Sequence, residues 1–321
     1  MKRFFGSITV CALCVAMPIG AAAQAYPAKP IRMVVPFAPG GATDTFSRVL
    51  AAELSNNLGQ QVIVENRPGA GTTIGADVVA KAAPDGHTLL FTDLSTHTIT
   101  ASLYAKLPYD PLRSFAPVAA ANSSPLLLVV HPSVGVKSVR ELIALAKRQP
   151  GIPCGNSGVG TVTHMTAEKF RMRAAIDVTA VSYKGGAVPV IALLGGEIAM
   201  LFATVPASIE HVRKRKLVAL GVAGDRRSPF FPEIPAIGET VKGVEGAVIS
   251  GVLAPAGTPR TIVERLNAEF AKASEGQKVK EIYATNAAET LKMSPSALQQ
   301  SLERDAKTWA EVVDATGVKV N

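Results

Sequence analysis

Four glycine-rich segments are the main candidates for chemistry in this 321-residue chain, and each follows a short apolar run. They occupy residues 39–43, 68–73, 155–161 and 183–186. Glycine lets backbone N–H groups approach a ligand closely, and a helix that begins there adds roughly half a positive charge. Such segments predict a binding site for a carboxylate or a phosphate that needs no arginine. At any single segment, the alternative is that the glycines only connect two elements.

A nucleotide site is a second interpretation of the same glycines. Residues 155–160 do not follow the G-x-G-x-x-G order of dinucleotide-binding proteins, and no Walker lysine follows any of the four segments. The sequence therefore disfavours a nucleotide cofactor.

The histidines and serines of the sequence do not form the motifs of a metal site or of a serine hydrolase. The histidines show no H-E-x-x-H motif and no paired spacing for zinc, so we expect no metal site and no cofactor. No serine lies in a G-x-S-x-G motif. Ser157 with His164 would suggest a hydrolase, but we expect His164 on the first turns of a helix, facing either a ligand cleft or the core. A triad assembled from distant segments stays an alternative, so a secreted hydrolase is the second hypothesis.

Short apolar runs alternate with amphipathic stretches along the chain, which is typical of an α/β fold with mainly parallel sheets flanked by helices. Strands are expected at residues 31–37, 62–64, 88–91, 126–130, 152–155, 179–183, 198–202 and 217–222. The run 126–130 is apolar throughout, so both of its faces should be covered. In such sheets ligands bind beyond the carboxyl ends of the strands, where the four glycine-rich segments lie.

Helix starts are marked by caps. Ser138 and Glu141 form a capping box that opens a helix, which Pro150-Gly151 ends. Thr258 and Ser294 each stand before a proline, which predicts an N-cap followed by proline at the first helical position. The last helix should bury four side chains at helical spacing: Leu298, Leu302, Trp309 and Val313.

The length favours two lobes, since domains usually span about 100–200 residues. The two terminal helices have no strands of their own, so we expect them to return to the first lobe. This predicts a discontinuous first lobe, residues 26–126 plus 252–321, around a second lobe at 127–251. Two chain crossings, near Leu126 and Val252, would form a hinge.

The first residues predict export. Lys2 and Arg3 precede an uncharged apolar stretch, residues 4–19, and an A-x-A cleavage site at 23–25. The stretch is shorter than the roughly 20 residues that span a bilayer. We therefore expect residues 1–25 to be a cleaved signal peptide and the protein to be periplasmic.

Cleavage leaves one cysteine, Cys154, and rules out an internal disulfide; we expect a small buried hydrophobe rather than a nucleophile. The formal charge of +8 falls to +6 once Lys2 and Arg3 are removed, which mildly attracts anionic ligands. The basic run 211–216 is best explained as the solvated end of a helix, so no nucleic-acid partner is expected.

Several longer motifs make the chain similar to a known family. They cover residues 26–32 with 34–41 and 44, 64–71 with 74–75, 84–90, 183–185 with 193–196, and 254–259. Over the whole mature chain the sequence resembles the substrate-binding proteins of tripartite tricarboxylate transporters, the Bug family. His87 stands where tyrosine is commoner in that family.

The resemblance implies a two-lobed Venus-flytrap fold that closes on a small organic carboxylate. In such proteins the ligand contacts mainly backbone amides, hydroxyls and ordered waters. By motif match the first-lobe wall carries over to Phe37, Gly40, Gly41 and Thr43, with Ser95 and Thr96 beside it. The second-lobe wall carries over to Ser157, Gly158, Gly160, Thr161 and His164, with Lys184 and Gly185 nearby. The implied partners are a small and a large membrane subunit; we expect a monomer, and a role in feeding a sensor kinase is an alternative.

Two departures from the family bear on the ligand. Ala203 replaces an aspartate on the pocket side, which favours an amine-free di- or aromatic carboxylate over an amino acid. Asp44 or Asp93 could supply the missing carboxylate from the first lobe. Residues 249–251 replace a tryptophan near the hinge.

Overall fold

The computed structural model of the protein describes residues 26–104 and 106–320. The predicted signal peptide, residues 1–25, lies outside the described residues, so its cleavage stays a prediction.

The strands of the described residues join into one continuous mixed sheet. They are β1 (Ile31–Val35), β2 (Val62–Asn66), β3 (Thr88–Asp93), β4 (Phe115–Val130), β5 (Ile152–Asn156), β6 (Val178–Ser182), β7 (Met200–Thr204), β8 (Val218–Val222), β9 (Ala247–Pro255) and β10 (Glu289–Thr290). The order is β2-β1-β3-β9-β4-β7-β5-β6, and β10 and β8 also pair with β4. Every strand expected from the sequence is present.

The parallel strand pairs fall into two separate groups, and the antiparallel pairs connect them. β1 is parallel to β2 and β3, and β5 is parallel to β6 and β7. The pairs that involve β4 or β9 are antiparallel. The α/β fold class is therefore confirmed, with two parallel groups of strands that are linked by two long antiparallel ones.

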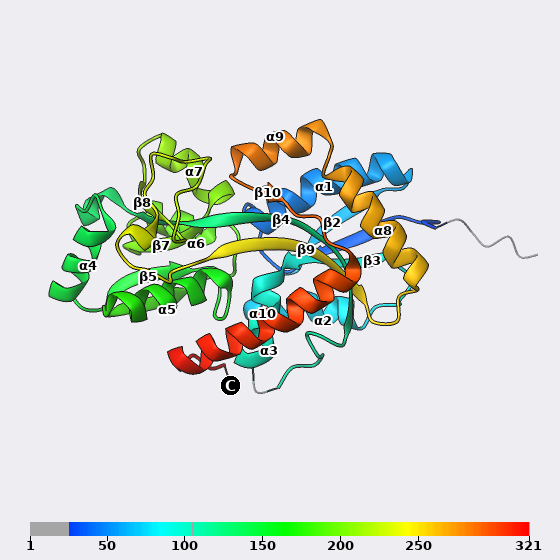
Figure 1. Ribbon diagram of the computed structural model, residues 1–321, viewed down its shortest axis with the longest axis horizontal. Coiled ribbons are helices and arrows are strands. Elements are labelled where there is room, and N and C mark those ends of the chain that lie inside the picture. Colours follow the sequence, from blue (N-terminus) through cyan, green and yellow to red (C-terminus); the bar gives the residue numbers. More distant parts are fainter. Residues whose placement is uncertain (1–25, 105, 321) are drawn as a thin grey trace, which may run out of the picture.

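Strand β4 joins the two groups. Its first part, residues 115–125, pairs with β9, whereas residues 126–130 pair with β7 and β8. Figure 1 shows β4 and β9 side by side through the middle of the molecule, with β1–β3 on one side and β5–β8 on the other. This is a two-lobed arrangement. The apolar run 126–130 is fully buried, as predicted.

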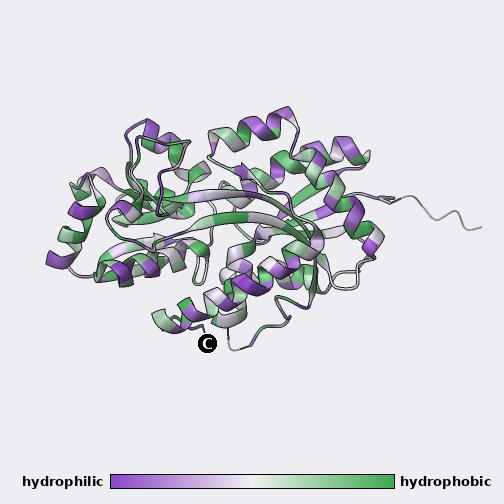
Figure 2. Cartoon of the chain, in the orientation of Figure 1, coloured by the Kyte–Doolittle hydropathy of each residue, from purple (hydrophilic) through white to green (hydrophobic). Residues whose placement is uncertain are grey.

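Helices cover the sheet on both lobes. They are α1 (Ala42–Leu58), α2 (Thr73–Ala80), α3 (Leu94–Leu103), α4 (Val139–Arg148), α5 (Val162–Ala174), α6 (Val188–Leu194), α7 (Val205–Arg213), α8 (Arg260–Ala273), α9 (Gln277–Thr285) and α10 (Pro295–Thr316). Short 3-10 turns occupy Ala70–Thr72, Pro132–Val134 and Ile237–Glu239. In Figure 2 the central strands are largely hydrophobic, and hydrophilic residues concentrate on the outer helices.

Two of the three predicted N-caps are confirmed. Ser138 accepts the N–H of Glu141 at 3.2 Å, and Ser294 accepts the N–H of Ala297 at 3.2 Å. The Thr258 prediction is wrong: its hydroxyl donates to the carbonyl of Pro255 at 2.7 Å, and Pro259 itself is the N-cap of α8. The extended backbone of Pro259 (ψ 136°) delays the helix by one residue.

The two predicted terminal helices pack on β4 and on helices of the first lobe. α8 contacts α1 and β4, and α10 contacts α3 and β4. All four predicted residues of α10 are buried, from 1% exposed at Val313 to 9% at Trp309. α10 also contacts α5 of the other lobe, which the sequence did not indicate.

Candidate functional site

A cavity lies at the carboxyl ends of β1, β3, β5 and β7, between the helices that follow them. Its lining residues are Phe37, Gly41, Ala42, Thr43, Asp93, Thr96, Ser157, Thr161, Val162, Thr163, Gly186, Thr204 and Val248. The empty volume is about 330 Å³.

Four helix N-termini meet at this cavity. α1 begins after Gly41, α3 after Asp93, α5 after Thr161 and α7 after Thr204. Within the described residues no acceptor takes the N–H groups of Ala42 or Thr43, at the start of α1. Free N–H groups and the positive ends of helix dipoles both favour a bound anion.

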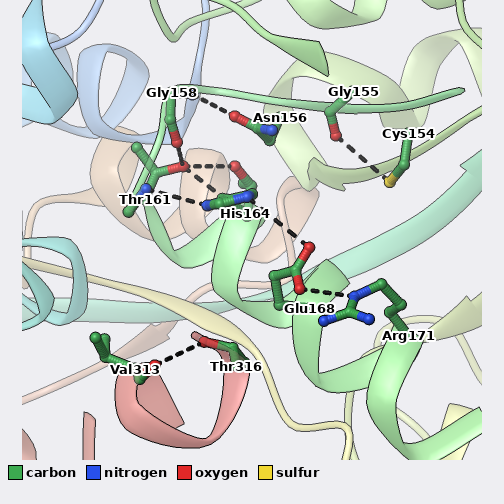
Figure 3. A network of polar contacts seen from close by, with 12 residues as sticks. Cys154, Gly155, Asn156, Gly158, Thr161, His164, Glu168, Arg171, Val313 and Thr316 are labelled. Carbon is green, nitrogen blue, oxygen red and sulfur yellow. Dashed lines mark hydrogen bonds and ion pairs between the residues drawn. The ribbon is translucent and has the colours of Figure 1, made fainter. Parts of the chain in front are cut away.

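The loop before α5 is held in shape by polar contacts, which Figure 3 shows. Asn156 accepts the N–H of Gly158 at 2.9 Å, and the Thr161 hydroxyl donates to the carbonyl of Gly158 at 2.7 Å. Gly160 donates its N–H to Nδ1 of His164 at 3.2 Å. The positive φ of Gly158 (134°) and Gly160 (76°) explains why glycine is needed at both positions.

His164 lies under this loop and is a structural residue there. Burial lowers its pKa, although nearby Glu168 opposes the shift. The neutral ring accepts from Gly160 through Nδ1, and its Nε2 lies 4.0 Å from Glu168. Ser157 instead donates its N–H to the Thr163 hydroxyl at 3.0 Å. Among the described residues no hydrogen bond joins the Ser157 hydroxyl to His164.

Cys154 is buried, as predicted, and burial raises the pKa of its thiol to about 12. A thiol with this pKa stays protonated at neutral pH and is a poor nucleophile.

Asp93 is the acidic residue of the cavity wall. Its carboxylate caps α3 by accepting the N–H groups of Ser95 and Thr96 at 3.3 and 3.2 Å, and it also accepts the N–H of Ile249 at 3.1 Å. The Thr96 hydroxyl donates to it as well. Burial raises the pKa of Asp93 to about 6, even though these hydrogen bonds act in the opposite direction.

Asp44 does not line the cavity, and its carboxylate accepts hydrogen bonds from neighbouring residues of the first lobe. It accepts from the N–H of Gly40 at 3.0 Å, from Arg48 at 3.0 Å and from Asn66 at 2.9 Å. Burial tends to raise its pKa, but these partners outweigh burial and the pKa of Asp44 is lowered. Of the two aspartates considered from the sequence, Asp93 is thus the one that lines the cavity.

Contacts across the cavity hold the two walls together. The N–H of Val162 donates to the Thr96 hydroxyl at 3.0 Å, and the N–H of Ala187 donates to the carbonyl of Pro39 at 3.3 Å. A Cβ atom on Gly41 would lie only 3.0 Å from the Cα of Gly186. The structure therefore represents a closed arrangement of the two walls.

The fourteen site residues predicted from the sequence fall into three groups. Six line the cavity: Phe37, Gly41, Thr43, Thr96, Ser157 and Thr161. Five lie directly behind or beside the lining residues: Gly40, Gly158, Gly160, His164 and Gly185.

The remaining three point elsewhere. Lys184 is exposed and is not among the lining residues. Ser95 lines a separate hollow next to Trp309 of α10. Ala203 packs in an apolar cluster with Leu127 and Val129. Successive residues of a strand face opposite sides, so Thr204, not Ala203, lines the cavity. The inference about ligand charge drawn from Ala203 loses its basis.

The sequence analysis did not select Ala42, Val162, Thr163, Gly186, Thr204 or Val248. Five of them directly adjoin selected residues, and strand alternation would have pointed to Thr204 rather than to its neighbour Ala203. Val248 comes from β9, about 150 residues away from the cavity segments of β3, and no local signal indicates it.

Within residues 26–104 and 106–320, no helix is long and apolar enough to cross a membrane. The same residues contain no group of three or more His, Cys, Asp or Glu side chains that could hold a metal ion.

A two-lobed α/β fold with helix N-termini around a central cavity defines a solute-binding protein of the periplasmic-binding-protein class. Residues 46–318 match the family model described as Tripartite tricarboxylate transporter family receptor. The chain belongs to this family, as the motif resemblance indicated.

Individual relatives agree with this assignment. BugT of Bordetella pertussis is 37% identical over 311 residues, which cover 95% of this chain and 94% of BugT. A solved structure of an R. palustris protein with adipate has a TM-score of 0.87 at 33% identity and covers 91% of this chain and 98% of that chain. MatC from Rhodopseudomonas palustris with bound malate has a TM-score of 0.84 at 32% identity and covers 90% and 100%, respectively.

Proposed function

We propose that this protein is a periplasmic solute-binding protein that captures one small organic carboxylate in the cavity between its lobes. It then delivers the carboxylate to the small and large membrane subunits of a tripartite tricarboxylate transporter. Export would depend on the signal peptide at residues 1–25, and the protein would act as a monomer without a metal or cofactor.

One observation carries this proposal: helix N-termini from both lobes meet at one cavity. α1 and α3 approach it from one lobe, and α5 and α7 approach it from the other. A carboxylate between them accepts N–H groups and interacts favourably with the helix dipoles. Two similar proteins were solved with adipate and malate, which are small organic carboxylates.

The same site supports binding better than catalysis. His164 is neutral, its Nδ1 is occupied by Gly160, and it does not activate Ser157. Cys154 is buried beneath the loop as a protonated thiol. We therefore propose that the protein is not an enzyme.

A thermal-shift screen of the mature protein tests the proposal. The ligands would be di- and tricarboxylates, aromatic acids and acidic amino acids, each with and without chelator. A ligand at one hundred times its Kd should stabilise the protein by about 2.7 kcal/mol, which gives a clear shift. Chelator should leave the shift unchanged. Absence of any shift across the carboxylates would contradict the proposal, and turnover of a bound acid would favour the hydrolase alternative.

A further inference from the structure

Thr204 is a residue of the cavity wall whose side-chain hydroxyl makes no hydrogen bond to any described residue. Its hydroxyl oxygen is buried, and no described residue donates to it or accepts from it. Among the described lining residues it is the one with such an oxygen. A buried hydroxyl without a partner is costly, so this position is explained better by a ligand than by the fold.

The other side-chain N-caps at the cavity give a direct comparison. Asp93 accepts N–H groups from the first turn of α3, and Thr161 accepts the N–H of His164 in α5. Thr204 is the N-cap residue of α7 and makes no such bond. Its hydroxyl is therefore free to turn toward the cavity.

The first turn of α7 offers fewer backbone N–H groups to an anion, which makes the Thr204 hydroxyl a more important donor there. Pro206 stands in the first turn and has no N–H to offer an anion. The Thr204 hydroxyl adds a donor at the positive end of the helix, where the prolyl residue cannot supply one. Since the chain places no lysine, arginine or histidine among the described lining residues, such neutral donors must hold a carboxylate.

The helix that Thr204 caps, α7, packs on α1 of the other lobe. The first N–H groups of α1, on Ala42 and Thr43, have no acceptor within the described residues. Building on the proposed function, we propose that Thr204 is a specificity-determining residue that donates its hydroxyl to the ligand carboxylate opposite the N-terminus of α1. The carboxylate then bridges the two lobes, and both sets of donors are satisfied only in the closed form.

The test compares Thr204→Val and Thr204→Ser with the wild type by calorimetry, using L-malate, succinate and adipate as probes. Thr204→Val should weaken the best of these probes about tenfold or more, equivalent to about 1.4 kcal/mol. Thr204→Ser keeps the hydroxyl and should stay within about threefold of wild type, a difference well below 1.4 kcal/mol.

Thr258→Val is the matched control. The Thr258 hydroxyl is also buried, but it donates to the carbonyl of Pro255 away from the cavity. This variant should lose thermal stability and keep its affinity. Thr204→Val should show the opposite result, an unchanged or higher melting temperature without ligand and weaker binding, because its hydroxyl has no partner in the fold.

The outcomes separate this inference from the proposed function. If the wild type binds none of these acids or others in the screen, the proposed function fails. If the wild type binds and Thr204→Val binds equally well, the role of Thr204 is wrong and the proposed function stands. If Thr204→Ser is as weak as Thr204→Val, the methyl group rather than the hydroxyl matters, and the inference is again overturned.

Discussion

At the scale of single residues, Asp93 introduces an acidic group into the cavity that we propose binds an anion. Its pKa is raised to about 6 by burial, so ionisation of this side chain is disfavoured in the fold. A carboxylate bound nearby would raise the pKa of Asp93 further, because like charges repel. Binding would then be coupled to the uptake of a proton.

The coupling predicts tighter binding at lower pH. If the ligand raises the pKa of Asp93 by about one unit, affinity should increase roughly fourfold between pH 7.5 and pH 6.0. Asp93→Asn removes the charge and should flatten this dependence, while losing some stability at the α3 cap. Calorimetry at both pH values in two buffers measures affinity and proton uptake together. A variant with the same pH profile as the wild type would rule out Asp93 as the source.

Gly41 tests how closely the two walls must approach. Its backbone (φ −89°, ψ 179°) suits any residue, so conformational strain is not the reason for glycine here. The reason is the 3.0 Å distance between a Cβ atom at this position and the Cα of Gly186. At this contact between the walls, the neighbouring Gly40 (φ 88°) and Gly186 (φ 62°) do require glycine for conformation.

Gly41→Val should therefore keep the walls apart and weaken ligand binding about tenfold, or 1.4 kcal/mol. Far-UV circular dichroism should stay native. Gly195→Val is a matched control, because Gly195 has an ordinary φ of −78° and its nearest contacts lie at 3.6 Å. Equal affinities of the two variants would place the ligand elsewhere.

At the scale of elements, α10 is the helix that contacts both lobes. It packs on α3 and β4 and also on α5. At the α5 contact, Nζ of Lys169 lies 4.3 Å from the centre of the Trp309 ring. Trp309 is the single tryptophan of the chain, so tryptophan fluorescence reports on the surroundings of this one ring. The contact should strengthen when the lobes close.

Lys169→Met removes the cation but keeps an apolar side chain over the ring. A cation–π pair of this kind contributes about 0.5–1 kcal/mol, so affinity should fall roughly two- to fivefold if the contact favours the closed form. Ligand titration should also change Trp309 emission in the wild type. Lys147→Met, on the exposed side of α4, is the control and should bind normally. No change in affinity for Lys169→Met would mean that the contact is equal in open and closed forms.

At the scale of the whole molecule, β4 and β9 are the connections between the lobes. The pairing of β4 changes from β9 to β7 at Leu126, which is the first crossing expected from the sequence. Residues 247–251 of β9 already pair with β3 or with the first part of β4. We therefore propose lobes at 26–126 plus 247–321 and at 127–246, so that the second crossing falls before Ala247 rather than near Val252 as the sequence suggested.

Motion about these connections predicts a change in overall size. Small-angle scattering should give a smaller radius of gyration with saturating L-malate, or with the best carboxylate from the screen, than without ligand. The N–H contacts from Val162 and Ala187 across the cavity are the ones that opening would break. A radius of gyration that does not change on binding would contradict a hinged closure.

The sequence alone was sufficient for the features that depend on neighbouring residues. Apolar runs marked the strands, Ser138 and Ser294 marked helix starts, and the buried face of α10 followed from spacing. Three of the four glycine-rich segments, 39–43, 155–161 and 183–186, supply residues of the cavity wall, because a ligand site at the carboxyl ends of strands is built from the turns that follow them. Segment 68–73 supplies none of the lining residues. These are local properties, so the order of residues is enough to determine them.

Tertiary structure decided which atoms face the cavity. Ala203 and Thr204 are adjacent in sequence, yet one packs in the core and the other lines the cavity, because the pairing of β7 with β4 and β5 sets which side each residue faces. Val248 arrives from a distant strand, and Asp93 is buried only once Ile249 and Thr96 surround it. Side-chain direction, burial and pKa depend on packing between segments far apart in the chain, so only the folded molecule determines them.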